Sequence, residues 1–187
     1  MKTKLSLIIG ALFALCGCVP TLHSLYTEKD IVFDKALLGT WTDANSKDSW
    51  TFERDGEKAY RLIYKDSEEK SGRFEVHLFK IGNQQFLDLF PDVSALKELK
   101  QNDLYRFHLF PVHTFAKVTQ IEPALQMAFA DPKWFEAHLN ENPKALRHER
   151  IEDRIVLTAS TQELQDFIRK HAETKGPFGE ASDLRRK

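Results

Sequence analysis

The feature that most constrains the fold is a run of short alternating segments between Leu37 and Ala130. Apolar and polar residues alternate within each segment, and turn residues interrupt the run about every 8 to 12 positions. An alternation with a period of two puts successive side chains on opposite faces of a strand, so each segment has one face to bury. The run therefore predicts an antiparallel, mainly β domain.

The clearest hairpin lies between Trp50 and Tyr64, where Asp55-Gly56 supplies the positive φ that a tight turn needs. Its second strand carries Tyr60, Leu62 and Tyr64 on one face. The same alternation predicts further strands over 37–41, 74–78, 86–89, 105–111, 114–121 and 124–130. A short helix or ordered loop is expected over 94–102.

The pattern changes after Ala130. Asp131-Pro132 combines an N-cap side chain with a proline at the first helical position, so a helix is expected from there to about Leu139. A strand pair is predicted over 146–151 and 154–158. Ser160 and Glu163 then form a capping box, which opens a second helix whose apolar face would pack on the sheet. That face carries Leu164, Phe167, Ile168 and His171.

The N-terminus has the features of an export signal. Lys2 and Lys4 precede an apolar run from Leu5 to Leu15, which is shorter than the roughly 20 residues that span a bilayer. The end of the run, Leu15-Cys16-Gly17-Cys18, resembles the lipobox of bacterial lipoproteins, with Cys18 as the acceptor. The resemblance implies a diacylglycerol thioether on Cys18, cleavage before it, and acylation of the new amine, for instance by palmitate. Cys16 would leave with the signal peptide.

Charge and composition limit the partners. The chain has 187 residues, of which 42% are hydrophobic and 29% charged, a balance that suits one globular domain. Removal of Lys2 and Lys4 with the signal leaves 25 basic against 28 acidic side chains, so no nucleic-acid partner is expected. Val19 follows the acceptor cysteine where an Asp would favour the inner membrane, so the expected location is the outer membrane, facing the periplasm.

Eight antiparallel strands most economically close into a barrel, because closure removes the exposed edges. Leu38-Gly39-Thr40-Trp41 is similar to the Gly-x-Trp motif of the lipocalins, whose barrels also precede a helix and a ninth strand. This resemblance covers 37–158 and implies an apolar ligand in the barrel mouth. No Arg stands at Ala130-Asp131, where lipocalins place one over the Trp, and Arg147 or Arg154 are candidates for that role.

The predicted fold is therefore mainly β: an eight- to nine-stranded, lipocalin-like (calycin) antiparallel barrel with two C-terminal helices. The alternative is an α+β open antiparallel sheet that the helices cover. The expected divisions are a signal peptide over 1–17, the lipid-bearing Cys18 and a tether over 18–35, the barrel domain over 36–175, and a polar tail over 176–187.

Motifs of common enzymes are absent from the sequence, which contains no Gly-x-Ser-x-Gly, no His-Glu-x-x-His, no P-loop and no Gly-x-Gly-x-x-Gly. No catalytic residue, metal or cofactor is predicted, and the protein is not expected to be an enzyme. His77, His108 and His113 come nearest to a set of metal ligands. Asp88 alternates with Phe86 and Phe90, so it is either solvated on the outer face or a functional carboxylate that faces a cavity.

Two functions remain in view. In the first, the anchored barrel binds a lipid or another small apolar molecule, with Tyr60, Tyr64 and Phe107 as the ligand-binding residues. In the second, the barrel core is solid and the protein binds or assembles envelope proteins, whose identity is unknown. The surplus of Phe, 14 residues, suits both functions because large side chains can line a cavity or fill it.

Overall fold

The computed structural model describes residues 18–43, 46–96, 100–152, 154–171 and 176–187. Its main sheet is built from β2 (Gly39–Asp43), β3 (Ser49–Asp55), β4 (Ala59–Lys65), β5 (Ser71–Ile81), β6 (Gln84–Pro91), β7 (Thr114–Gln120), β8 (Ala124–Phe129) and β11 (Ser182–Arg186). Among the described residues, these eight strands are hydrogen-bonded in the order β5-β4-β3-β2-β11-β8-β7-β6, and β6 pairs with β5 again. The predicted closed antiparallel barrel is thus confirmed.

The long strand β5 makes the closure. Its 11 residues pair with β4 over 71–76 and with β6 over 74–81, so it belongs to both sides of the seam. A short extra strand, β1 (Ile31–Val32), also pairs with β5, through Phe79 and Leu78. The hairpin between Trp50 and Tyr64 forms as predicted, and Gly56 has a φ of +68° in its turn.

The prediction of a loose polar tail is wrong for the end of the chain. β11 lies between β2 and β8 and pairs with both, so it is the strand that completes the barrel. Leu184 is its one buried residue, 1% exposed, and the other four positions are exposed. A strand with partners on both sides satisfies its backbone groups through the ladders, so it needs little apolar surface of its own.

Arg186 on β11 covers Trp41, the role for which Arg147 and Arg154 were candidates. Its guanidinium carbon lies 4.4 Å from the centre of the Trp41 ring, and its nitrogens donate to the carbonyl groups of Leu38 (2.5 Å) and Ala36 (2.6 Å). Arg147 instead binds Glu163, at 2.6 Å. The expected partner of the tryptophan is therefore an arginine near the C-terminus, on the strand that closes the barrel.

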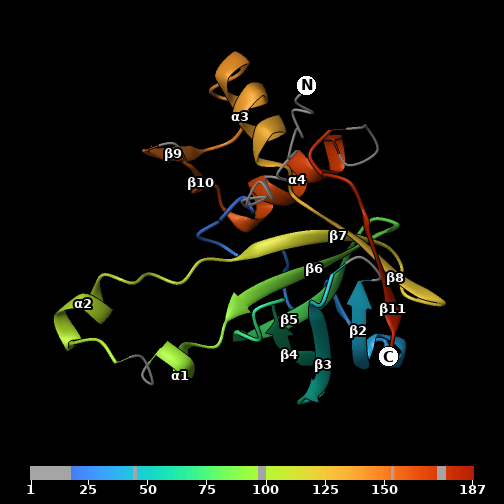
Figure 1. Ribbon diagram of the computed structural model, residues 1–187. Helices are drawn as coiled ribbons and strands as arrows, with labels where there is room; N and C mark the ends of the chain where they lie inside the picture. Colours follow the sequence, from blue (N-terminus) through green and yellow to red (C-terminus); the bar gives the residue numbers. More distant parts are fainter. Residues whose placement is uncertain (1–17, 44–45, 97–99, 153, 172–175) are drawn as a thin grey trace, which may run out of the picture.

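A layer of helices covers one side of the barrel wall. It consists of α3 (Pro132–Glu141), α4 (Thr161–His171) and a separate two-stranded sheet of β9 (His148–Ile151) and β10 (Arg154–Leu157), all above the barrel in Figure 1. Asp131 caps α3 and Ser160 forms the capping box with Glu163, as predicted. The protein thus has two cores, one inside the barrel and one between the barrel wall and this layer.

The strand predicted over 105–111 is wrong. Residues of that stretch form α2 (Asp103–Phe107), whose N-cap Asn102 accepts a hydrogen bond from the backbone N–H of Tyr105 at 2.8 Å. A capped helical turn competes with a strand for the same backbone groups, and no neighbouring strand is paired with this segment. The short α1 (Val93–Leu96) precedes it within the expected helix or loop, whose Leu99 lies outside the described residues.

The predicted tether also differs from the structure. Val19 is 2% exposed and Leu25 is fully buried, and the 3-10 turn Lys35–Leu37 leads directly into β2. We call residues 18–30 the N-terminal segment. It packs in the outer core with α4, because its apolar side chains meet the same wall that the helices cover.

Candidate functional site

The predicted lipid-bearing residue begins a segment that is fixed to the domain. Cys18 is exposed, whereas Thr21 is fully buried. The backbone of Thr21 exchanges two hydrogen bonds of 2.9 Å with His113, and the N–H of Leu22 donates to Leu157 at 2.9 Å. A lipid on Cys18 would therefore be held against a defined face of the protein, without a long spacer.

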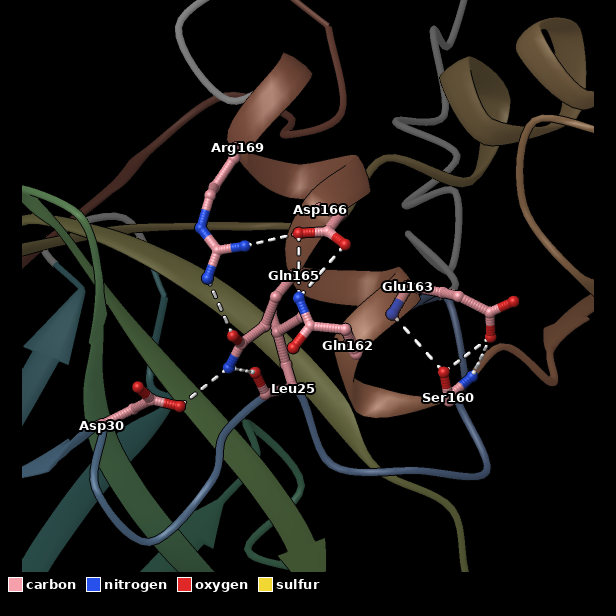
Figure 2. A network of polar contacts seen from close by, with 8 residues as sticks. All are labelled: Leu25, Asp30, Ser160, Gln162, Glu163, Gln165, Asp166 and Arg169. Carbon is pink, nitrogen blue, oxygen red and sulfur yellow. Dashed lines mark hydrogen bonds and ion pairs between the residues drawn. The ribbon is translucent and has the colours of Figure 1, made fainter.

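Helix α4 holds the next part of the N-terminal segment (Figure 2). The side chain of Gln165 is 3% exposed, and its amide nitrogen donates to the carbonyl oxygen of Leu25 at 3.0 Å and to Asp30 at 2.8 Å. Arg169 donates to the other end of the same amide, at 3.0 Å. A buried amide with partners on both ends specifies one position for the segment, since any shift would leave it unsatisfied.

A buried acid and a histidine meet under the N-terminal segment. Asp88 is 1% exposed, and its Oδ1 lies 2.6 Å from Nδ1 of His113. Its Oδ2 accepts the backbone N–H of Leu25 at 3.0 Å, and the ring of Phe90 lies 4.4 Å from the imidazole. Asp88 is thus on the outer wall, as one interpretation held, but it is not solvated, because the N-terminal segment covers it.

The other histidines do not join this pair. His77 stacks on Tyr26 with ring centres 4.6 Å apart, and His108 lies exposed at the end of α2. Within the described residues, no group of three or more His, Cys, Asp or Glu side chains is placed to hold a metal ion. The arrangement of Asp88 and His113 connects the N-terminal segment to the start of β7.

Between β6 and β7 the chain leaves the barrel and exposes apolar side chains. We call residues 102–110, which include α2, the α2 arm; it projects far from the barrel in Figure 1. Its exposed residues are Leu104 (73%), Tyr105 (54%), Phe107 (83%) and Phe110 (76%). Side chains of this kind on a soluble surface mark an interaction site.

The three predicted ligand-binding residues are not brought together. Phe107 lies on the α2 arm, whereas Tyr60 and Tyr64 belong to the barrel core. The Tyr60 hydroxyl accepts the N–H of Asp34 at 2.7 Å and donates to the Asp34 carbonyl at 3.0 Å. The Tyr64 hydroxyl donates to Asp48 at 3.0 Å. Burial raises the pKa of each tyrosine to about 12, so both hydroxyls stay protonated and serve structural bonds.

The barrel interior is filled around these side chains. A side chain that lines a cavity of molecular size keeps some accessible surface. The inward-facing residues with none are Leu37, Trp41, Tyr60, Leu62, Val76, Leu78, Ala116 and Leu125. The inner face of several strands therefore meets other side chains, at the density typical of a protein interior.

A pocket lies in the covering layer, between α3 and α4. Its volume is about 400 Å³, and its lining includes His138, Phe167, Lys170 and His171. The rings of His138 and His171 are 4.9 Å apart, and Trp134 stacks on His138 at 4.7 Å. Burial, the neighbouring His138 and the charge of Lys170 lower the pKa of His171. The pocket thus combines aromatic faces with one permanent cation.

Comparisons with known proteins give no relative: no protein family, no curated protein and no solved structure matches this chain. In the part of the chain that the structure describes, no helix is both long and apolar enough to cross a membrane. The function must therefore be argued from the residues themselves.

Proposed function

We propose that this protein is a bacterial envelope lipoprotein, anchored through Cys18, whose solid barrel is a docking scaffold and not a carrier of small ligands. The filled interior carries the proposal, because Trp41 and Tyr60 are completely buried where a carrier would have its binding chamber. This observation favours the second of the two functions that the sequence leaves open. Anchoring rests on the lipobox resemblance at Leu15–Cys18.

Three features support a scaffold. The N-terminal segment is clamped by Gln165 and Asp88, so the anchor would hold the barrel in one orientation. The α2 arm exposes apolar surface that the described part of this chain does not cover. The barrel itself is closed, so the edges of its eight strands are protected from unwanted pairing.

The anchor is tested by metabolic labelling with palmitate and by membrane fractionation. Cys18→Ala should abolish the label and release the protein from the membrane fraction. Cys16→Ala is the matched control, because Cys16 would leave with the signal peptide and its loss should change neither result. A labelled Cys18→Ala protein would show that the anchor is elsewhere.

The solid barrel is tested by native mass spectrometry of the protein released from membranes by detergent. The expected spectrum contains the chain with its covalent lipid and no additional apolar molecule. A stoichiometric lipid that survives dilution and is lost from a Tyr60→Ala variant, but not from a Phe107→Ala variant, would contradict the proposal and restore the carrier.

The pocket between α3 and α4 favours a second candidate function, the binding of a small aromatic acid. Its volume falls in the range of ligand sites, and Lys170 could hold a carboxylate while Phe167 packs on a ring. Titration with benzoate, followed by the imidazole NMR signals of His138 and His171, tests this function. Lys170→Ala should weaken any shift, and unchanged signals at saturating benzoate would reject it.

A further inference from the structure

The α2 arm and the predicted anchor belong to one face of the protein. His113, which ends the excursion between β6 and β7, exchanges two backbone hydrogen bonds with Thr21. Cys18 and Phe110 each lie three residues from this bridge, so each is within about 11 Å of it along the chain. Leu22, which is 39% exposed, lies beside the bridge.

The distribution of side chains around α2 indicates the kind of partner. Leu104, Tyr105 and Phe107 occupy successive positions i, i+1 and i+3, which an α-helix turns by about 100° per residue. Their side chains therefore point to several sides of the helix and not along one stripe. A groove on a protein takes a helix with one apolar stripe, whereas a fluid apolar layer accepts a helix that is apolar all round.

The charges of the arm are compatible with such a layer. Asp103 and Arg106 form an ion pair with each other within α2, which lowers the cost of moving either one out of water. Lys100 precedes the arm and would meet the phosphates of anionic headgroups. Tyr105 has the apolar ring and polar tip that favour the boundary between headgroups and acyl chains.

We infer that the α2 arm inserts Leu104, Phe107 and Phe110 into the interface of the same membrane that holds Cys18, and so forms a second contact between barrel and bilayer. The inference rests on the proposed anchor for its location. One acyl attachment fixes a point, and a second contact on the same face fixes the tilt of the barrel. The partner is thus a lipid surface, with its anionic headgroups and outer acyl segments.

The test uses the mature chain with Cys18→Ser, which has no other cysteine and no lipid. Leu104→Cys in this background accepts an environment-sensitive dye, and vesicles of phosphatidylethanolamine and phosphatidylglycerol are then added. We expect the emission to brighten and shift to the blue. The same dye on Lys58→Cys, in the turn between β3 and β4, is the matched control and should not respond.

A second measurement does not depend on the dye. Partition of the unlipidated chain onto the same vesicles, measured by flotation, should fall roughly tenfold or more in the Phe107→Ser, Phe110→Ser double variant. Circular dichroism and thermal unfolding check that the variant is folded. Equal partition of the variant and its parent, or equal dye responses at positions 104 and 58, would overturn the inference.

The outcomes separate this inference from the proposed function. A palmitate label on Cys18 with no dye response at position 104 overturns the membrane contact of the arm and leaves the anchor intact. A dye response without any palmitate label supports the contact and rejects only the anchor. A photocrosslinker at position 107 that captures a protein and no lipid in intact cells would also overturn the inference.

Discussion

The barrel interior and the α2 arm are made of the same kinds of side chain, and they differ completely in exposure. Trp41 and Tyr60 are fully buried, whereas Phe107 and Phe110 are 83% and 76% exposed. Residues 105–109 even alternate in the manner of a strand. Alternation therefore shows that a side chain needs an apolar partner, but it does not show whether that partner lies in the same chain.

Removal of the last strand should have the largest effect on this contrast. A chain that ends at Gly179 lacks β11, so β2 and β8 become open edges and Leu184 no longer fills the interior. We expect a loss on the order of 5 kcal/mol or more in unfolding free energy, comparable to the whole stability of many domains. Near-ultraviolet circular dichroism and limited proteolysis measure it. Arg185→Ala, at an exposed position of the same strand, is the control and should stay within about 0.5 kcal/mol.

A pair of truncations compares the two regions directly. Trp41→Ala removes a fully buried ring and should lower the unfolding free energy by about 3–5 kcal/mol. Phe107→Ala removes a ring that makes little contact with the described chain, so its cost should be below about 0.5 kcal/mol. Urea unfolding followed by fluorescence measures both. Similar costs at the two positions would mean that the arm is part of the core in solution.

The cover over Trp41 should contribute less than the ring itself. Arg186→Ala loses a cation–π contact and two carbonyl partners, so we expect about 1–3 kcal/mol. Gly39→Ala should cost a similar amount, about 1–3 kcal/mol, because φ is +115° and a Cβ would lie 2.8 Å from the Arg186 guanidinium. In the double variant the clash is absent, so the combined cost should be smaller than the sum. Strict additivity would contradict this contact.

The smallest expected effect lies outside both regions, at the start of α4. Hydrogen bonds from Arg147 and Ser160 lower the pKa of Glu163 to about 2 from its ordinary value of 4.5. A carboxyl group with a lowered pKa in the folded state stabilises the fold above pH 4.5, and this contribution is lost as the pH falls towards about 2. Glu163→Gln should remove that part of the pH dependence in urea unfolding. An unchanged acid slope would assign it to other groups.

The sequence predicts the structure well where the signals are local. The hairpin between Trp50 and Tyr64 needs only its own alternation and the Asp55-Gly56 turn, and the caps at Asp131 and Ser160 lie beside the helices that they begin. The long-range features are missed. Residues 182–186 carry one apolar side chain and become a strand only because two edges await it.

The candidate site shows the same division. The pairing of Asp88 with His113 depends on the register of β6 and β7 and on the path of the N-terminal segment, none of which a single-chain pattern contains. The helical arm had a usable signal, since Asn102-Asp103 is a typical helix start, but alternation at 105–109 outweighed it. Of the ligand-binding residues that the sequence suggested, Tyr60 and Tyr64 are explained by packing and hydrogen bonds.

The position of β11 has a consequence for biogenesis. The strand that completes the barrel is the last part of the chain to be synthesised and exported, and its partner Asp43 was made about 140 residues earlier. The barrel cannot close on the emerging chain, so folding must wait for the complete polypeptide. A product that ends early keeps two open strand edges and remains a substrate for proteases. Closure by the C-terminus thus lets the cell distinguish finished chains from unfinished ones.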